Sequence, residues 1–488
     1  MLSALAQELS AFMAVEQRGT DVEVSGVRRD SRAVQAGDLF AAIPGANVDG
    51  ARFVPAAKKA GASAVLAAHA LDASVPHLVV ANVREALARS AHALYGHPAE
   101  SLEVIGITGT NGKTTCAWLI DAMLSSLGKA PALLGTVAQR AGEARTPASF
   151  TTPEADDLAR FVRSAVAAGS THLVMEVSSH GLVQHRVTGV RFRVAAFTNL
   201  SQDHLDFHKT MRAYGEAKAT LFRNHQPAVS VINVDDPFGA GLAAQLTTPV
   251  IRCSGQGRSS DLRASDVRYD RNGIRAQLHY DGETVALESP LVGRHNLENL
   301  LTSVGVALGL DVPLVDAAAA LRNAVGAPGR MERVPSKGAA ILVDYAHTPD
   351  ALTNALATLR PITTGRLIVV FGCGGDRDAG KRPKMGAAAS AADLAIVTSD
   401  NPRTEEPAAI VSAILPGMTV PKVSDLAKNG YTVEVDRRKA IALAIHAAQD
   451  NDTVLIAGKG HEDYQIVGTQ KFPFDDREVA KEALEGVG

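Results

Sequence analysis

The chain has 488 residues, of which 46% are hydrophobic and 21% charged, which is typical of a globular protein with well-filled cores. At roughly 100–200 residues per domain, this length suggests about three domains. The formal net charge of −3 shows no preference for nucleic acid or for a membrane surface, and so argues against a protein devoted to either partner.

The start of the chain and its cysteines bear on where the protein works. The first residues, MLSALAQELSAFMAVEQRG, lack a basic start and contain Glu8, so they predict a helix and not a signal peptide. No run of about 18 consecutive apolar residues occurs, so no transmembrane helix is expected. Cys116, Cys253 and Cys373 are far apart and lack the spacing of a metal site. We therefore expect a cytoplasmic protein, because thiols stay reduced in that compartment.

Residues 1–98 are the first predicted domain, in which short apolar runs alternate with helical stretches at 56–60 and Val83–Leu94. Its unusual segment is Arg28–Gly50, which is rich in Asp, Ser, Arg, Gly and Asn. This segment could be a binding loop, or a polar turn ahead of a strand at Leu39–Ile43. The residues alone favour the turn.

Residues 99–328 are the second predicted domain, and its first strand, Val104–Ile107, runs into a glycine-rich turn and a helical pattern. The sequence IGITGTNGKTT, residues 105–115, has the strand–loop–helix layout of a phosphate-binding loop. Backbone N–H groups of such a loop point at phosphate oxygens, Lys113 adds a positive charge, and Thr114 offers a hydroxyl to Mg²⁺. The strict motif has glycine where this chain has Ile107, so an ordinary glycine-rich turn is the alternative.

The rest of this domain continues the strand–helix alternation, which indicates a mostly parallel sheet with helices on both faces. Residues 261–288 differ, because polar and apolar residues alternate around Asn272-Gly273 and Asp281-Gly282, which predicts appended hairpins. The segment HNLENLLTSVGVALGL then opens a long helix. The further strands are predicted at His172–Val177, Val194–Thr198 and Val229–Asn233.

Residues 329–488 are the third predicted domain, which follows a natural hinge at Ala327, Pro328 and Gly329. The alternation of strands and helices resumes there and again predicts an α/β domain. Helices are predicted at Pro349–Leu359 and Ala387–Ala392. The predicted strands are Ala340–Val343, Leu367–Phe371, Leu394–Thr398 and Thr453–Ala457.

Polar clusters come directly after nearly every predicted strand. TGTNGKTT, EVSSHGL and TNLSQDHLDFH follow strands of the second domain, and DYAHTPD, GCGGDRDAGKRP, TSDNPRTEEP and GKGHEDYQ follow strands of the third. In open parallel sheets, ligands bind outside the carboxyl ends of the strands. We therefore expect a binding site at these edges, in a cleft between the two domains.

Some residues in the second domain could hold a metal ion. Glu176 ends an apolar strand beside the phosphate loop, where a carboxylate is an expected Mg²⁺ ligand, although a strand-end glutamate in solvent is the alternative. The segment Asp203–His208 suggests metal or phosphate contacts, with His204 a possible metal ligand, or else caps and turns. Lys218 lies on a predicted helix and would by itself be interpreted as a surface charge.

The third domain has its own candidates after its strands. Asp344 and His347 follow a buried strand and are typical of the edge of a polar site. The glycine-rich loop containing Arg377–Arg382 suits phosphate or carboxylate binding better than core packing. In the turn Asp400–Arg403, Pro402 restricts the backbone and the guanidinium can bind a carboxylate through two parallel hydrogen bonds.

Taken in order, the motifs resemble those of the Mur ligases of peptidoglycan synthesis. The set is TGTNGKTT, EVSSHGL, TNLSQDHLDFH, YGEAKATLF, HNLEN, GRMERV, DYAHTPDAL, GCGGDRDAGKRP, DNPRTEEP and GKGHEDYQ. The resemblance runs from Asp30 to the end of the chain, and it accounts for Ile107, because the loop of this family is TGTNGKT. It implies a three-domain α/β architecture: a UDP-substrate domain (1–98), an ATPase domain with a P-loop-type parallel sheet (99–328), and a Rossmann-like domain that binds an amino acid (329–488).

The resemblance implies that the enzyme uses ATP to join a carboxylate to an amine through an acyl phosphate, with release of ADP and phosphate. Such catalysis rests on positioning and on neutralisation of charge. Lys113, Thr114 and Mg²⁺ would act on the β- and γ-phosphates, Glu176 would be a further ligand of that ion, and His204 would bind a second Mg²⁺. Lys218 matches the carbamylated lysine of the family, an N6-carboxylysine, whose carboxylate-like group favours Mg²⁺ where an ammonium would repel it.

The resemblance also implies three sets of binding residues. ATP would contact Gly109, Thr110, Asn111, Gly112, Lys113, Thr114, Thr115, Asn296, Asn299, Arg330 and Asp344. UDP-N-acetylmuramoyl-L-alanyl-D-glutamate, called the UDP-muramoyl dipeptide from here on, would contact Ser31, Gly45, Ala46, Asn47, Thr151, Thr152, Ser178, Gln184 and Arg186. meso-Diaminopimelate would contact Arg377, Asp400, Asn401, Pro402, Arg403, Gly458 and Glu462.

Arg403 bears on which amino acid is added. Diaminopimelate has at its distal end a carboxylate that L-lysine lacks, and Arg403, aided by Asn401, Arg377 and Glu462, would pair with it and repel the bare ammonium of lysine. A relative that adds L-lysine and a folylpolyglutamate-synthase-like enzyme are the alternatives among ligases. An ATP-binding regulatory or transport-coupled protein is the alternative outside them. The expected oligomeric state is a monomer.

Overall fold

The computed structural model describes residues 1–45, 48–72, 74–148 and 150–486. Contacts divide the chain into two compact units. The first consists of Met1–Arg263, His279–Glu283 and Glu298–Ala320, and the second of Ala264–Leu278, Thr284–Leu297 and Leu321–Gly488. Within the described ranges, no helix has the length and apolar character needed to cross a membrane.

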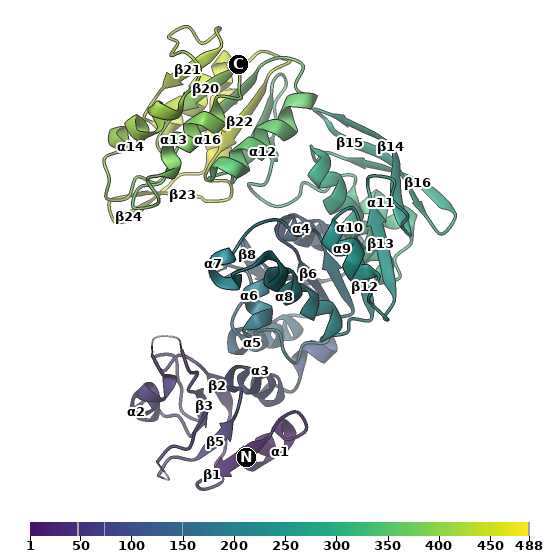
Figure 1. Ribbon diagram of the computed structural model, residues 1–488, viewed down its shortest axis with the longest axis vertical. Coiled ribbons are helices and arrows are strands. Elements are labelled where there is room, and N and C mark those ends of the chain that lie inside the picture. Colours follow the sequence, from purple (N-terminus) through teal and green to yellow (C-terminus); the bar gives the residue numbers. More distant parts are fainter. Residues whose placement is uncertain (46–47, 73, 149, 487–488) are drawn as a thin grey trace. The chain divides into compact units, whose positions relative to one another are not determined.

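The first unit begins with a five-stranded sheet in the order β1-β5-β4-β3-β2, in which only the β1–β5 pair is antiparallel (Figure 1). Alternate residues of a strand point to opposite faces, so β3 places Leu39 against α1 and α3, and Phe40 on the side of α2. The elements are β1 Val15–Arg18, β2 Gly26–Arg28, β3 Asp38–Ala41, β4 Ala64–Ala67, β5 His77–Val80, α1 Leu2–Leu9, α2 Val54–Lys59 and α3 Val83–Leu94, with 3₁₀ turns at Gly50–Phe53 and Pro98–Ser101.

A larger sheet follows in the first unit, in the order β13-β12-β11-β6-β10-β7-β8-β9. Neighbours from β13 to β7 are parallel, and only the pairs that involve β8 are antiparallel. Strands β10 and β11 are buried throughout, as expected for a parallel sheet covered on both faces. The strands are β6 Glu103–Thr108, β7 Pro131–Leu134, β8 Ala138–Ala141, β9 Ala144–Pro147, β10 His172–Glu176, β11 Val194–Phe197, β12 Val229–Asn233 and β13 Val250–Ser254.

Helices cover this sheet through apolar side chains. Leu158 of α5, Phe222 of α8 and Leu242 of α9 belong to one core cluster with strand residues such as Met175 and Phe197. Thr210 caps the start of α8 by accepting a hydrogen bond from the Ala213 N–H. The helices are α4 Lys113–Ser126, α5 Ala155–Ala167, α6 Ser179–Val183, α7 Leu205–His208, α8 Met211–Arg223 and α9 Pro237–Ala243.

The predicted hairpins are confirmed as three strands, β14 Leu262–Asp270, β15 Gly273–Tyr280 and β16 Glu283–Ser289. Asp281 and Gly282 make the second turn with φ of 48° and 82°, the left-handed pair that suits a tight hairpin. The first turn lies one residue earlier than predicted, at Arg271-Asn272, so Gly273 opens β15. The predicted long helix is α10 Arg294–Gly309, and α11 Leu314–Leu321 follows it.

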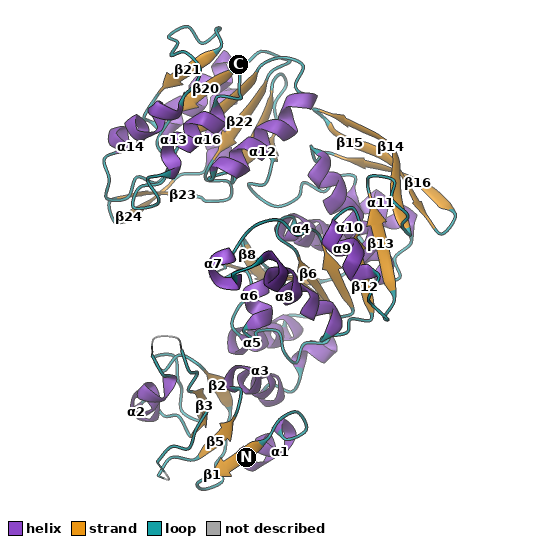
Figure 2. Cartoon of the chain, in the orientation of Figure 1, coloured by secondary structure: helices purple, strands orange, loops and turns teal. Residues whose placement is uncertain are grey.

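The second unit is built on a six-stranded sheet in the order β17-β18-β22-β19-β20-β21, of which β20, β21 and β22 are labelled in Figure 2. All pairs except β17–β18 are parallel. Neighbouring residues of β19 face different cores: Val369 packs with α12, α13 and α14, and Val370 packs with α15 and α16. The strands are β17 Glu332–Val334, β18 Ala340–Asp344, β19 Leu367–Phe371, β20 Leu394–Val397, β21 Gly430–Val433 and β22 Thr453–Ala457.

The other elements of the second unit surround this sheet. Strands β23 Tyr464–Val467 and β24 Gln470–Pro473 form a separate hairpin. The helices are α12 Pro349–Leu359, α13 Lys381–Ala389, α14 Pro407–Ile414, α15 Arg437–Ala447 and α16 Asp476–Glu485, with 3₁₀ turns at Arg360–Ile362 and Leu415–Gly417.

Two predicted helices are wrong in extent. The helix predicted at Ala387–Ala392 begins six residues earlier, at Lys381, because Pro383 lies in the first turn, where its missing N–H costs nothing. The N-terminal helix stops at Leu9, and Val15–Arg18 instead form β1 against β5. In that case the pairing with a distant strand overrides the local pattern.

A fully buried ion pair links the first residues of α15 and α16 in the second unit. The Arg437 guanidinium donates to both carboxylate oxygens of Asp476 at 2.8 and 2.6 Å, and both side chains are 0% exposed. The same guanidinium donates to the carbonyl oxygens of Ser399 and Ala457 at 3.3 and 3.0 Å. The pair therefore fastens two helices to the carboxyl ends of β20 and β22.

Replacement of Asp476 by alanine should leave the buried Arg437 charge without its partner. We expect the free energy of unfolding to fall by about 3–5 kcal/mol, measured by urea titration with circular dichroism. Glu482→Ala is the matched control, because Arg438 and Glu482 join the same two helices on the surface, where the pair is more than half exposed. Equal losses in the two variants would contradict the special weight given to the buried pair.

Candidate active site

The loop after β6 has the geometry of a phosphate-binding loop. Gly109 and Gly112 have φ of 149° and 87°, which a residue with a side chain rarely adopts. A Cβ on Gly109 would overlap the Thr198 hydroxyl, and a Cβ on Gly112 would overlap the Asn299 amide oxygen. Helix α4 starts directly after this loop without a capping side chain, so an anion bound there would complement its first N–H groups.

The segment after β11 holds this loop in place. Asn199 accepts hydrogen bonds from the backbone N–H of Thr110 and of Asn111 through its carbonyl oxygen and its side chain, at 2.8 and 2.9 Å. The Thr198 hydroxyl donates to the Asn111 carbonyl oxygen at 2.6 Å. The polar residues that follow β11 therefore shape the phosphate loop, a role that sequence reasoning did not assign to them.

Two lysines converge on one carbonyl oxygen of this loop. The ammonium groups of Lys113 and Lys218 donate to Gly109 O at 2.8 and 2.7 Å. Lys218 is only 1% exposed and lies over the ring of Tyr214 at 4.2 Å, so the interpretation as a surface charge is wrong. Burial, followed by the charge of Lys113, lowers the pKa of Lys218 to about 6, and its amine is therefore mostly neutral at pH 7.

Glu176 is buried at the end of β10, so the alternative of a solvated strand-end carboxylate is also wrong. Its Oε2 accepts hydrogen bonds from the hydroxyls of Thr114 and Thr136 at 3.0 and 3.1 Å, and its Oε1 accepts one from the Thr136 N–H at 2.7 Å. The structure therefore brings together two of the predicted metal ligands, Thr114 and Glu176.

These two oxygens fit Mg²⁺, which prefers hard oxygen ligands. Across the described ranges, no group of three or more His, Cys, Asp and Glu side chains could hold a metal ion. Mg²⁺ commonly keeps several waters and substrate phosphates as ligands and takes only one or two from the protein, so a hydroxyl and a carboxylate suffice.

His204 lies in the turn before α7 with φ of 52°, and its side chain is 46% exposed. Its ring lies 4.9 Å from that of His180 and 6.0 Å from that of Tyr214, the ring that also contacts Lys218. Burial, with a contribution from His204, lowers the pKa of His180. In the described chain no hydrogen bond or ion pair joins His204 to Thr114 or Glu176, so its role as a metal ligand stays a prediction.

The residues predicted to hold the dipeptide lie beside Glu176. The Thr152 hydroxyl donates to the Glu176 carbonyl oxygen and accepts from the Ser178 N–H, both at 2.9 Å. Arg186 donates to the Thr152 carbonyl oxygen at 2.7 Å and to the Gln184 amide oxygen. Thr151 is 3.0 Å from Thr136, so five of the predicted residues form one cluster: Thr151, Thr152, Ser178, Gln184 and Arg186.

Sequence reasoning missed Glu154, a buried carboxylate among arginines. Arg186 and Arg84 each lie 3.0 Å from it, and Arg29 lies 3.7 Å from it. Burial lowers the pKa of Arg186, the Glu154 charge raises it, and the two neighbouring arginines lower it again. Arg29 also pairs with Asp156 and Asp157, at 3.4 and 2.9 Å, so Glu154 is left mainly to Arg84 and Arg186, two guanidinium groups beside one carboxylate.

The predicted loop of the first domain is described only in part. Gly45 donates its N–H to the Val48 carbonyl oxygen at 3.1 Å. Ala46 and Asn47 lie outside the described residues. Ser31 is half-buried and lies two residues beyond Arg29, one of the arginines beside Glu154.

The two asparagines of the HNLEN motif fall in different units. Asn299 belongs to the first, where it borders Gly112 and accepts a weak hydrogen bond from the Cys116 thiol at 3.5 Å. Asn296 belongs to the second and donates to the Val292 carbonyl oxygen at 2.8 Å. The predicted role of Asn299 beside the phosphate loop is thus compatible with its position.

Asp344 ends β18 in the second unit and accepts a hydrogen bond from the Met331 N–H at 2.8 Å. Burial raises its pKa, and the hydrogen bond and the charge of Arg330 oppose that shift. The Arg330 guanidinium lies 4.8 Å from the ring of Tyr345. Its buried Nε finds no hydrogen-bond partner among the described residues, so this group can still bind a ligand.

Arg403 links its own turn to the glycine-rich loop after β19 and to β23 of the second unit. Its guanidinium donates to the Gly375 carbonyl oxygen at 2.7 Å, and its N–H donates to the Ile466 carbonyl oxygen at 3.0 Å. Its φ of 51° is unusual for arginine and sets the direction in which the side chain leaves the turn. Arg377, on the same glycine-rich loop as Gly375, is exposed and makes no hydrogen bond or ion pair within the described part of the chain.

The turn after β20 meets the loop after β22. Asn401 donates from its side-chain nitrogen to Glu462 Oε2 at 2.8 Å. A Cβ on Gly458 would come within 2.5 Å of the Asp400 carboxylate, so only glycine fits there. The structure therefore brings together six of the predicted amino-acid-binding residues: Asp400, Asn401, Pro402, Arg403, Gly458 and Glu462.

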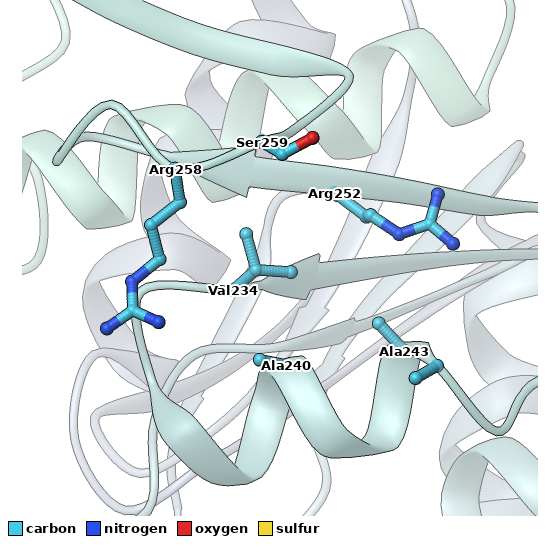
Figure 3. A pocket seen from close by; sticks show the side chains of 7 residues that line it. Val234, Ala240, Ala243, Arg252, Arg258 and Ser259 are labelled. Atoms are coloured by element: carbon cyan, nitrogen blue, oxygen red, sulfur yellow. The ribbon is translucent and has the colours of Figure 1, made fainter.

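A hollow of about 430 Å³ lies elsewhere in the first unit, between α9 and the ends of β12 and β13 (Figure 3). Val234, Ala240 and Ala243 line it between Arg252 and Arg258. The two arginines already face Asp261 at 3.5 Å and Asp235 at 3.9 Å. This hollow therefore offers no unbalanced charge, and the candidate site stays at the phosphate loop.

Comparisons with known proteins agree with this arrangement. Three family models match successive segments: the Mur ligase family catalytic domain over residues 23–95, the Mur ligase middle domain over 107–307, and the Mur ligase glutamate ligase domain over 329–460. The chain is 48% identical over 486 residues to the UDP-N-acetylmuramoyl-L-alanyl-D-glutamate–2,6-diaminopimelate ligase of Gloeobacter violaceus, which covers 98% of this chain and 97% of that protein.

Solved structures show the same fold. One of a UDP-N-acetylmuramoyl-L-alanyl-D-glutamate–2,6-diaminopimelate ligase matches with a TM-score of 0.73 and 34% identity over 95% of each chain. The MurF ligase from Thermotoga maritima in complex with ADP matches in fold, with a TM-score of 0.61 and 20% identity over 96% of this chain and 98% of that one. The α/β fold and the three successive domains are thus confirmed, and the chain belongs to the Mur ligase family.

Proposed function

We propose that this protein is an ATP-dependent ligase that adds meso-2,6-diaminopimelate to UDP-N-acetylmuramoyl-L-alanyl-D-glutamate, as the name of its 48% identical relative states for that protein. One structural observation carries the proposal: Arg403 projects from a turn built together with Asn401, Asp400 and Glu462. This set can take both charges of a distal amino-acid group, whereas L-lysine would bring only one.

The first unit would bind ATP and activate the acyl carboxylate. The β6–α4 loop and Lys113 bind phosphate oxygens, and the neutral amine of Lys218 avoids placing a second full charge beside Lys113. Thr114 and Glu176 would hold Mg²⁺, which supplies charge neutralisation at the phosphates when it is bound. We further propose that Lys218 is carbamylated and that His204 provides a ligand for a second ion.

Carbamylation suits the position of Lys218 for a chemical reason. Carbon dioxide adds to a neutral amine and not to an ammonium, and the lowered pKa of Lys218 keeps the neutral form available. The product is an anion close to Lys113, since both side chains reach the carbonyl oxygen of Gly109. A neutral amine beside Lys113 would thus be replaced by an anion that attracts the Lys113 ammonium.

The UDP-muramoyl dipeptide would bind beside Glu176. Thr151, Thr152, Ser178 and Gln184 offer hydroxyl and amide groups, and Arg186 offers a cation for a carboxylate or a phosphate. Ser31 and the loop 45–47 are proposed for the nucleotide end. The roles of Asn296, Arg330 and Asp344 toward ATP are proposed in the same way.

The second unit would bind diaminopimelate. Arg403 and Arg377 would pair with the distal carboxylate, and Asp400 and Glu462 would take the distal ammonium. Such a site disfavours L-lysine, because its carboxylate-binding arginine would be left unpaired beside a cation. We propose that the reaction takes place in the cytoplasm, where ATP is available, and that the enzyme acts as a monomer.

Release of ADP tests the proposed function directly. A coupled assay should show ADP only when ATP, Mg²⁺, the UDP-muramoyl dipeptide and diaminopimelate are all present, with L-lysine giving at most a few per cent of that rate. ATP turnover without the two acceptor substrates would point to a regulatory or transport-coupled ATPase. Faster turnover with L-lysine would instead indicate the lysine-adding reaction.

Lys218→Ala should lose most of the activity, by about 100-fold or more, because the carbamate can no longer form. Bicarbonate or formate should restore part of it by supplying a small carboxylate, and the measurement is steady-state ADP release with and without these ions. Lys129→Ala is the control, because that lysine is exposed beyond α4. Activity of Lys218→Ala close to wild type without added ions would contradict the role given to this residue.

Arg403→Ala should raise the KM for diaminopimelate strongly. A lost charge-assisted pair is worth about 3 kcal/mol, which corresponds to a change on the order of 100-fold. The KM for ATP should not move, because the phosphate loop is untouched. Arg438→Ala, which removes an exposed arginine of α15, is the control, and an unchanged KM for diaminopimelate in Arg403→Ala would rule out the recognition role.

A further inference from the structure

Lys459 is a buried cation that none of the roles described so far uses. It lies in the loop after β22, between Gly458 and Glu462, and its side chain is 0% exposed. Removal of an ammonium from water is costly unless nearby groups compensate for the lost hydration. The groups around Lys459 therefore indicate what this charge does.

The ammonium of Lys459 contacts two residues of the proposed amino-acid site. It lies 3.3 Å from Asn401 Oδ1 and 3.4 Å from Glu462 Oε2. The ring of Tyr464 lies 5.5 Å from it and covers it from a third side. Both polar partners of this buried charge thus belong to the set proposed to bind diaminopimelate.

These contacts fix the orientation of the Asn401 amide. Its Oδ1 accepts hydrogen bonds from Lys459 and from the Ile466 N–H, the latter at 2.9 Å. With two donors on the oxygen side, the nitrogen side must point the other way, and it donates to Glu462 Oε2 at 2.8 Å. A flipped amide would place its N–H groups against two donors.

The same contacts orient the Glu462 carboxylate. Its Oε2 receives both the Asn401 amide and the Lys459 ammonium. Its Oε1 makes no hydrogen bond or ion pair within the described part of the chain, and the side chain is 19% exposed. Oε2 is therefore held in place by the protein, while Oε1 is available to a cationic ligand.

We propose that Lys459 is a positioning residue for substrate choice: it holds Asn401 and Glu462 so that Glu462 Oε1 accepts the distal ammonium of diaminopimelate. This inference rests on the proposed function and adds a residue to it. Lys459 itself does not touch the substrate. It holds Glu462 in one rotamer, so that the second amino group is recognised separately from the second carboxylate.

A pair of substrates isolates this effect. L-2-Aminopimelate has the reacting amine and the distal carboxylate of diaminopimelate but lacks the distal amine. The wild-type enzyme should therefore prefer diaminopimelate by on the order of 100-fold in kcat/KM, because the aminopimelate complex leaves Glu462 unpaired. Turnover with neither amino acid would instead overturn the proposed function itself, and this inference with it.

Lys459→Met should reduce that preference by about tenfold or more. We expect the KM for diaminopimelate to rise about tenfold or more, with kcat, the KM for ATP and the KM for L-2-aminopimelate each within about threefold of wild type. Glu462→Gln should raise the KM for diaminopimelate in the same way. The double variant should show no higher KM than the more impaired single variant, because both substitutions remove the same interaction. Lys471→Met is the matched control, since Lys471 also lies over Tyr464, at 4.1 Å, but is exposed.

The opposite results would overturn the proposal. If Lys459→Met raised the KM of both amino acids equally, or the KM for ATP as well, Lys459 would only support the fold. Retention of the wild-type preference by the folded variant would show that the lysine is not needed for it. Should Lys459→Met not fold, Lys459→Gln gives the same test, because it keeps a polar group in the cavity but removes the charge.

Discussion

Two ammonium groups sharing one carbonyl oxygen set the electrostatic problem of the first unit. Lys113 and Lys218 both bind Gly109 O in a site where burial weakens the screening of their charges. Such a site can reduce its positive charge by losing a proton or by binding anions. The lowered pKa of Lys218 favours loss of a proton. Phosphate oxygens, Glu176 and a carbamate would supply the anions. The glycines of the loop and the Asn199 contacts serve to keep that carbonyl oxygen in place.

The second unit also contains buried positive charges, and it compensates for them in two different ways. Arg437 has its partners within the protein, because its guanidinium is hydrogen-bonded to Asp476 and to two carbonyl oxygens. Lys459 is matched less completely, by two partners at 3.3 and 3.4 Å that both face the proposed substrate. The first buried charge supports the fold, and the second leaves its carboxylate partner with an oxygen for a ligand. The two differ by geometry and not by depth of burial.

Much of the fold followed from the sequence, because strand–helix alternation and apolar runs are local signals. The helices Val83–Leu94 and Pro349–Leu359 and the strand Thr453–Ala457 lie where they were predicted. Errors occurred where distant contacts decide the outcome, as at β1, or where a proline sits in a permissive position, as in α13. The predicted domain boundaries at residues 98 and 328 stay predictions.

For the candidate site, sequence motifs identified the polar residues on the loops but not the buried charged residues that contact them. Thr114 with Glu176, and Asn401 with Glu462, were predicted to belong together and do. Glu154 and Lys459 were missed, because a carboxylate after a proline or a lysine between glycines is unremarkable until its burial is known. The surface interpretation of Lys218 failed for the same reason. Burial depends on the packing of segments far apart in the chain.

The Arg437 contacts also bear on how such an enzyme could change its substrate during evolution. Arg437 donates hydrogen bonds to the main-chain oxygens of Ser399 and Ala457, and not to side chains of the segments after β20 and β22. Side chains further along these loops can therefore be substituted without loss of these hydrogen bonds. New amino-acid specificities could thus evolve on the same backbone, with little loss of stability at each step.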